Sequence, residues 1–300
     1  MIVLNAKSLG EEIKRLRKRN NLSQAQLAEG ICTQATISGI EAGRGYPSVD
    51  ILYILSIRLK VSLDYFYKIL LNDAQGYIQD TESLLEELMK KKNYHETFEI
   101  TKNELRQSTR NLGYKFDQLV KWVHIISSYY LKKIDWQKAV KMLEDLLDSN
   151  HPLFGQDFID FKIQNSLAII YAENKMFQKS LQQYNTILSY HDFLKQHYRF
   201  QIKIHYNLAK LYFLQQDYKH SLIHAELGIK LSSENEDISM AGQLYYQQGI
   251  SLEEMDADQD KIKDAFKTSL FIFQLLNRQE YIQMIIKKKG EFLETEQKGQ

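Results

Sequence analysis

A short stretch near the N-terminus carries several side chains that can donate or accept hydrogen bonds. An amide such as Gln34 offers a donor and an acceptor together, which matches the edge of an adenine, and nearby hydroxyls can reach bases or phosphates. These residue types therefore favour hydrogen bonding to a nucleic acid, and the alternative is an ordinary exposed polar surface. The candidates for this role are Gln24, Thr33, Gln34, Thr36, Ser38 and Arg44.

Residues suited to covalent or metal chemistry are sparse. His220 and His224 are spaced to share a metal ion, but no third ligand is evident, and we interpret them as a solvated helix face. The run 256–260 begins like a calcium loop, but Lys261 stands where such a loop needs glycine. No phosphate loop, nucleophile elbow or spaced thiol cluster occurs. We expect no enzyme activity, no cofactor and no metal site.

Short helices must position the polar stretch. Ser23 can cap a helix, with Gln26 completing a capping box, and Thr33 can cap the next one. Gly43 stands where a left-handed C-terminal cap belongs. Apolar residues at helical spacing mark further helices: Leu9, Ile13 and Leu16; Ile51, Leu55 and Leu59; Leu63, Phe66 and Leu70. The pattern predicts five short helices with a helix-turn-helix among them.

Composition favours an all-α fold with a basic N-terminal part. Only 2 prolines and 13 glycines interrupt 300 residues that are rich in helix formers. Residues 1–70 carry ten Lys or Arg against six Asp or Glu, a formal charge of +4, whereas the remainder carries −3. A polyanionic partner is therefore expected to meet the N-terminal part.

The protein is expected in the cytoplasm. A lone cysteine, Cys32, excludes an internal disulfide, and we expect it to pack as a small apolar residue. The N-terminus has too short an apolar run for a signal peptide, and no window approaches the roughly 18 apolar residues of a membrane span.

The remainder of the chain repeats with a period of 41 residues. Four columns share this period: Ser127, Ala168, Ala209; Tyr130, Tyr171, Tyr212; Trp136, Phe177, Tyr218; and Ala139, Ser180, Ser221. Tyr94 and Gly249 extend the pattern on either side. Helix pairs with small residues at the contacts and a polar turn are typical of tetratricopeptide repeats, here lengthened from about 34 residues. We expect about five degenerate repeats in a right-handed α-solenoid with a concave binding surface.

The N-terminal pattern resembles the Cro/C1-type (XRE) helix-turn-helix family. The shared residues are Leu22-Ser23-Gln24, Leu27-Ala28, Ile37-Ser38, Ile40-Glu41, Gly43, Pro47-Ser48 and Leu59. The resemblance implies that the third helix enters the major groove of double-stranded operator DNA. Many members have arginine directly after the serine of that helix, where this chain has Gly39. That phosphate contact is not carried over, and we expect a single DNA-binding domain to bind weakly.

Nearly the whole chain resembles the RRNPP family of quorum-sensing regulators of Gram-positive bacteria, most closely its PlcR type. The segments that carry the resemblance are Gln26-Leu-Ala-Glu-Gly-Ile-Cys-Thr-Gln, Tyr46-Pro-Ser-Val-Asp-Ile-Leu, Phe66-Tyr67, Ile170-Tyr-Ala-Glu-Asn and Gly242-Gln-Leu-Tyr-Tyr-Gln-Gln-Gly. The resemblance implies a cytoplasmic homodimer that binds a short signalling peptide in its repeats. The bound peptide controls how the two DNA-binding domains are positioned on an operator. We expect a helix-turn-helix domain at 1–70, a linker at 71–80, and a peptide-binding and dimerisation domain at 81–300.

The resemblance also implies a set of peptide contacts: Tyr67, Lys90, Lys92, Asn165, Asn207, Gln243, Tyr246 and Tyr281. Carboxamides can pair with a peptide bond, lysines attract carboxylates, and tyrosines offer apolar area at low entropic cost. Local capping or an interhelix hydrogen bond is the alternative for the two asparagines, and a solvated turn is the alternative for the two lysines. A repeat scaffold or repressor controlled by a protein partner remains the rival to peptide control.

Overall fold

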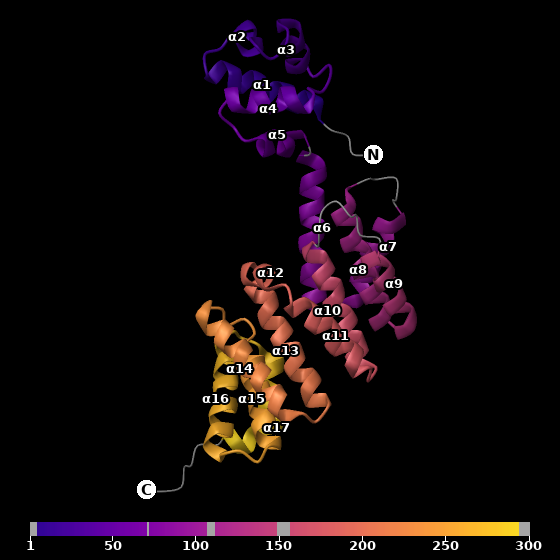
Figure 1. Ribbon diagram of the computed structural model, residues 1–300, viewed down its shortest axis with the longest axis vertical. Coiled ribbons are helices and arrows are strands. Elements are labelled where there is room, and N and C mark those ends of the chain that lie inside the picture. Colours follow the sequence, from indigo (N-terminus) through magenta and orange to yellow (C-terminus); the bar gives the residue numbers. More distant parts are fainter. Residues whose placement is uncertain (1–4, 71, 107–111, 149–156, 294–300) are drawn as a thin grey trace. The chain divides into compact units, whose positions relative to one another are not determined.

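The computed structural model describes residues 5–70, 72–106, 112–148 and 157–293, and over these residues the chain forms helices and no strand (Figure 1). The all-α prediction is confirmed. The chain divides into two compact units, residues 1–135 and 136–300. In the described parts of the chain, no helix is both long enough and apolar enough to cross a membrane.

A five-helix bundle, which we call the head, begins the first unit (Figure 1). Its helices are α1 (Ala6–Arg19), α2 (Gln24–Ala28), α3 (Gln34–Glu41), α4 (Val49–Arg58) and α5 (Leu63–Leu70). Ser23 and Gln26 form the predicted capping box at the start of α2. Gly43 ends α3 in the left-handed conformation, with φ of 67°.

The head is held by a closely packed contact between α1 and α3. Leu9, Ile13 and Ile37 are buried in one apolar core. Gly10 lies against the α3 backbone, where a Cβ atom would come within 2.2 Å of the Ile40 carbonyl oxygen. This contact sets the position of α3, the helix that carries most of the polar candidates.

The first unit continues with α6 (Asn72–Lys90), α7 (Tyr94–Arg106) and α8 (Tyr114–Tyr130). Residues 72–80, expected to be a linker, are helical and form the start of α6, while residue 71 lies outside the described residues. The boundaries at 70 and 80 stay predictions.

The second unit is a stack of helix pairs with one short extra helix that the repeat pattern did not predict. Its helices are α9 (Trp136–Asp148), α10 (Phe158–Glu173), α11 (Phe177–Leu188), α12 (His191–Gln196), α13 (Tyr198–Leu214), α14 (Tyr218–Glu234), α15 (Ala241–Glu254), α16 (Gln259–Leu275) and α17 (Gln279–Leu293).

The repeat columns have the structural roles that their spacing predicted. The aromatic column supplies the first residue of α9, α11 and α14, and Tyr94 likewise begins α7. The small residues are fully buried, and the Ser180 hydroxyl donates to the Ala168 carbonyl at 2.7 Å. In the next repeat Ser221 donates to Ala209 at 2.8 Å. The same interhelix bond thus recurs with the sequence period.

Candidate functional site

The exposed side of α3 carries four of the predicted DNA contacts. Thr33 caps the helix by accepting a hydrogen bond from the Thr36 backbone N–H at 3.1 Å. The hydroxyls of these two threonines bond to each other at 2.8 Å. Gln34 is exposed, and Ser38 is half-buried one helical turn further along. The structure therefore gathers these four residues on one short helix with a defined start.

A buried ion pair connects α3 to α1. The Nη2 of Arg17 donates to Glu41 at 2.9 Å, and its Nη1 donates to the Leu22 carbonyl at 2.8 Å. Burial acts to raise the pKa of Glu41, but hydrogen bonds from Arg17 and Gln24 outweigh it and hold that pKa below its ordinary value. Spacing along α1 does not reveal the burial of Arg17, because the carboxylate that pairs with Arg17 comes from a different helix.

Gln24 forms a hydrogen bond to the carboxylate of this ion pair. Its Nε2 donates to Glu41 at 2.9 Å, which fixes the start of α2 against the end of α3. One N–H of the amide is used in this bond and the second remains for a phosphate. The proposed phosphate contact of Gln24 stays a prediction.

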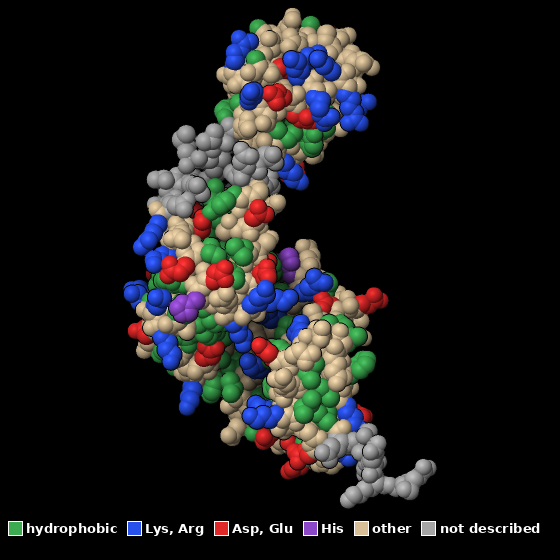
Figure 2. Space-filling view, turned by 180° about the vertical axis from the view of Figure 1, so that it is seen from behind, with side chains coloured by type: hydrophobic (Ala, Val, Ile, Leu, Met, Phe, Trp, Pro, Cys, Tyr) green, Lys and Arg blue, Asp and Glu red, His purple; other side chains and the backbone are tan. Residues whose placement is uncertain are grey.

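Gly39 and Arg44 lie at the end of the same surface. No atom lies within 4 Å of where a Cβ of Gly39 would be, so a side chain fits there. Arg44 is exposed just beyond α3. Lys and Arg side chains lie on the face of the head that Figure 2 displays, in keeping with the basic charge of this part of the sequence.

Three of the predicted peptide contacts lie in the first unit. Tyr67 is exposed on α5, and Lys90 is exposed at the end of α6. Lys92 is exposed in the turn before α7, in the left-handed conformation with φ of 56°. All three are accessible, and their roles stay predictions.

In the second unit, the structure brings the two predicted asparagines together. The Nδ2 of Asn207 on α13 donates to the Oδ1 of Asn165 on α10 at 2.9 Å. This is the interhelix hydrogen bond that we had kept as the alternative. It leaves the Nδ2 donor of Asn165 outside the bond, whereas the side chain of Asn207 also forms a hydrogen bond with the buried hydroxyl of Tyr184. The Nδ2 of Asn165 can match a C=O of a peptide backbone.

Tyrosines from three helices of the second unit lie near one another. Burial raises the pKa of Tyr206 to about 12, and the nearby phenols of Tyr281 and Tyr246 add to the rise. Tyr281 also stacks on Phe273, with ring centroids 4.8 Å apart. The structure therefore places two predicted residues beside Tyr206, which directly precedes Asn207 in the chain.

Lys203 lies on the same helix, one turn before Asn207. Its side chain is exposed, yet the surrounding protein lowers the pKa of its ammonium, and the charge of Lys162 lowers it further. We call Lys162, Asn165, Lys203, Tyr206, Asn207, Tyr246 and Tyr281 the amide cluster.

Sequence reasoning missed Lys203 and Tyr206. A signal was available for Lys203, because residues four apart share one face of a helix and Asn207 was already a candidate. Tyr206 had no such signal, since adjacent residues point in different directions and its neighbours come from α15 and α17.

Gln243 is the remaining predicted contact. It lies on α15, one turn before Tyr246, and only 9% of its surface is exposed. Its Oε1 has no hydrogen-bond partner among the described residues. Because this oxygen is itself buried, the structure does not expose it to a ligand, and the role of Gln243 stays a prediction.

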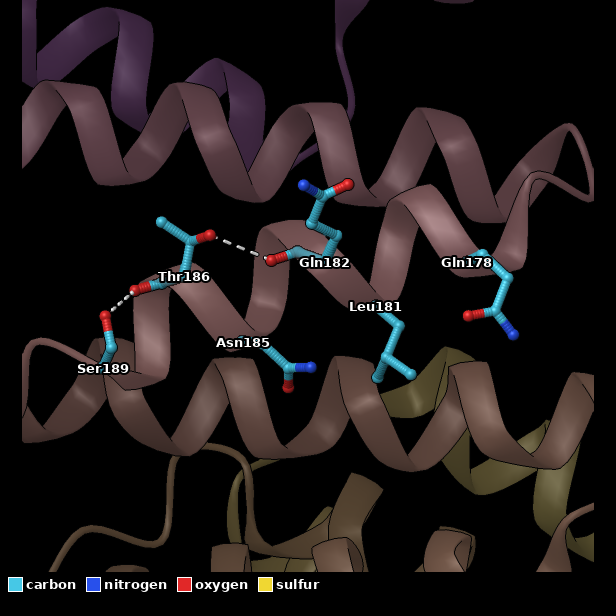
Figure 3. Close-up of a pocket in the computed structure, with 6 residues that line it drawn as sticks. All are labelled: Gln178, Leu181, Gln182, Asn185, Thr186 and Ser189. Atoms are coloured by element: carbon cyan, nitrogen blue, oxygen red, sulfur yellow. Dashed lines mark hydrogen bonds between the residues drawn. The ribbon is translucent and has the colours of Figure 1, made fainter.

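A separate open hollow of about 480 Å³ runs along α11. Its lining residues all come from that one helix: Gln178, Leu181, Gln182, Asn185, Thr186 and Ser189 (Figure 3). Thr186 and Ser189 donate to backbone carbonyls of their own helix, at 3.0 and 2.7 Å. The hollow contains none of the predicted contacts and has no enclosed polar group, so we do not assign it a function.

Of the two histidines expected on a solvated helix face, His220 is exposed and His224 is half-buried. The ring of His224 stacks on Tyr212, and its Nδ1 lies 3.1 Å from the Nδ1 of His205. Burial lowers the pKa of both His205 and His224 to about 4. The expectation is wrong for His224, because α13 and α14 pack through this imidazole pair.

Family models match residues in both units of the chain. The model of the RNPP family C-terminal domain matches residues 82–294, and a helix-turn-helix model matches residues 13–66. No curated protein matches the chain.

Solved structures match over nearly the whole chain. Bacillus thuringiensis PlcR in complex with the peptide PapR7 and DNA is 32% identical with a TM-score of 0.74, over 94% of this chain and 100% of that one. The apo form of PlcR is 30% identical with a TM-score of 0.73, over 94% and 99%. The pheromone receptor Rgg2 of Streptococcus dysgalactiae, 16% identical with a TM-score of 0.56 over 95% and 98%, shares the fold.

Proposed function

The chain belongs to the RNPP family, and from this membership we propose that it is a cytoplasmic transcriptional regulator that a short peptide controls. The head binds double-stranded operator DNA, the repeats bind the peptide in an extended form, and two copies act as a homodimer. We assign it no catalytic activity.

The Asn165–Asn207 bond carries the peptide-binding part of this proposal. Each asparagine fixes the other, so the remaining Nδ2 donor of Asn165 is held in place before a ligand arrives. Backbone recognition of this kind gives affinity without reading side chains, and an ordered amide pair lowers the entropic cost of binding.

The construction of α3 supports the DNA-binding part. Caps at both ends and the Arg17–Glu41 pair fix this helix against α1, so that its exposed residues form a rigid reading surface. We assign Gln34 to a base edge, and Thr33, Thr36, Ser38, Gln24 and Arg44 to bases or phosphates.

The peptide controls DNA binding through its different affinities for two conformations of the repeats. A peptide that binds one conformation of the repeats better than another shifts their population, and dimerised repeats transmit that shift to the spacing of the two heads. Half-sites must lie about one helical turn apart, or a multiple of it, so a small change in spacing alters operator affinity. We place Tyr67 as a link between ligand and head.

The test uses the full-length chain, an operator selected by it from random duplex DNA, and peptides selected by it from a random short-peptide library. Fluorescence anisotropy of the labelled operator should show that a selected peptide changes the Kd. An unchanged Kd across all selected peptides, together with a protein partner that alters it, would instead establish the protein-controlled scaffold.

A further inference from the structure

One buried position of the repeat is apolar in two repeats and carries a hydroxyl in the repeat between them. Leu143, Tyr184 and Ala225 are 41 residues apart, the period of the repeat, and each is at most 1% exposed. The repeats before and after thus fill this position with leucine or alanine. Helix packing alone therefore does not account for the phenolic oxygen of Tyr184.

Tyr184 lies in the interior of the second unit. Its helix, α11, packs against both α10 and α13 (Figure 1). The tyrosine belongs to an apolar core that also contains Ala168 of α10 and Leu208 of α13. A hydroxyl without a partner in such surroundings lowers the stability of the folded chain, because it loses its hydrogen bonds to water. The oxygen of Tyr184 therefore needs a hydrogen-bonding partner within the core.

The partner of this hydroxyl is the side chain of Asn207 on α13. Burial raises the pKa of the Tyr184 phenol, and the hydrogen bond with Asn207 acts against that rise. The same asparagine donates to Asn165 on α10 at 2.9 Å. The side chain of Asn207 is thus held from two helices, and a rotation of its amide would disturb both bonds.

Tyr184 cannot reach a ligand itself, because the surrounding helices enclose its side chain. Asn207 is half-buried and belongs to the amide cluster. The hydrogen-bonded chain from Tyr184 through Asn207 to Asn165 therefore connects the core of the unit to that cluster. A side chain that is fixed before a ligand arrives lowers the entropic cost of binding.

We propose that Tyr184 is a positioning residue of the peptide site, whose hydroxyl fixes the side chain of Asn207 and, through it, that of Asn165. The two amides are thereby held in the orientation that binds an extended peptide backbone. Tyr184 acts only through them and does not touch the peptide. This inference rests on the proposed function, because it concerns the geometry of the same site.

The experiment starts from one peptide selected by the wild-type protein from a random short-peptide library. Isothermal titration measures its Kd for the full-length wild type, Tyr184→Phe, Asn207→Leu and the double variant Tyr184→Phe/Asn207→Leu. Tyr184→Phe removes one oxygen and keeps the ring that fills the core. The matched control is Tyr171→Phe, because Tyr171 is also buried and its hydroxyl donates at 2.9 Å to Glu144, which is not a residue of the amide cluster.

We expect Tyr184→Phe to bind the peptide roughly 3- to 10-fold more weakly, because the ligand must then order one more mobile side chain. Tyr171→Phe should bind the peptide like the wild type. In the Asn207→Leu background, Tyr184→Phe should cause no further loss of affinity, because the amide through which the hydroxyl acts is absent. A tyrosine that only stabilises the fold would not show this dependence on Asn207.

A loss of the same size from Tyr184→Phe in both backgrounds would overturn the inference, because the hydroxyl would then act through packing and not through Asn207. Unchanged peptide binding by Tyr184→Phe, or a control variant that loses as much affinity, would also overturn it while leaving the proposed function intact. A wild type that binds no library peptide would contradict the proposed function itself.

Discussion

The side-chain amide of Asn207 donates to the side-chain carbonyl of Asn165 at 2.9 Å, across the contact between two neighbouring repeats. The two residues are 42 apart, one more than the repeat period. They therefore meet from adjacent positions of the repeat and not from identical ones. This geometry fixes both amides while leaving the Nδ2 of Asn165 outside the bond.

Asn207→Leu should weaken peptide binding by roughly tenfold or more, because a buried peptide group left without its partner costs about 1–3 kcal/mol. Isothermal titration with a selected peptide measures the loss. The matched control is Asn185→Leu, which removes an exposed amide from the hollow on α11. A control as damaging as Asn207→Leu would contradict the assignment.

Gly39→Arg should tighten operator binding. Open space surrounds this position, and an arginine there can reach a phosphate. Gly39→Ala separates the effect of a more stable helix from the effect of the added charge, since alanine improves helix propensity by roughly 1 kcal/mol without adding a charge. Only the arginine variant should steepen the salt dependence of the Kd, by about one unit in the log–log slope. Equal slopes for the two variants would show that no phosphate lies near residue 39.

Arg17→Met should destabilise the head by about 3–5 kcal/mol, because it leaves the buried carboxylate of Glu41 without its partner. Hydrogen exchange of the α3 amides in the full-length chain reports this local loss. Arg15→Met is the control, since Arg15 pairs with Glu12 on the surface and its loss should change little. Undiminished protection of α3 in Arg17→Met would show that the ion pair does not hold this helix.

The second unit should lose stability as the pH falls from about 6.5 to about 4. Burial lowers the pKa of His205 and His224 to about 4, so the unfolded chain binds protons in this window and the folded chain does not. The free energy of unfolding should fall by roughly 1.4 kcal/mol per pH unit for each histidine.

Urea unfolding at a series of pH values measures this dependence. The double variant His205→Gln/His224→Gln keeps hydrogen-bonding groups without titrating, and its stability should depend less steeply on pH. His191→Gln, at an exposed position on α12, should behave like the wild type. Equal slopes for the double variant and the wild type would rule out this imidazole pair as the source.

Local rules and the repeat period predicted much of the fold. The caps at Ser23 and Thr33 depend only on residues three positions away, so the sequence contains both partners of each hydrogen bond. The columns that recur every 41 residues can also be predicted from the sequence, because the same interhelix bond requires a serine at 180 and again at 221.

The features that were missed depend on partners distant in the sequence. Arg17 looks solvated on its own helix, and its burial follows only from Glu41 on α3. His224 becomes a packing residue through His205 on another helix. Tyr206 joins the amide cluster through tyrosines of α15 and α17. Periodicity along one helix cannot report which neighbour a polar side chain will meet.

The central claim is that a peptide bound at the Asn165–Asn207 pair sets operator affinity. Its most direct test is the Kd for a selected operator, with and without a selected peptide, in the wild type and in Asn165→Leu/Asn207→Leu. We expect the peptide to change the wild-type Kd by about 5- to 150-fold, the usual range of allosteric coupling. The variant should bind DNA like the unliganded wild type and should not respond to peptide. The same peptide response in both proteins would contradict the claim.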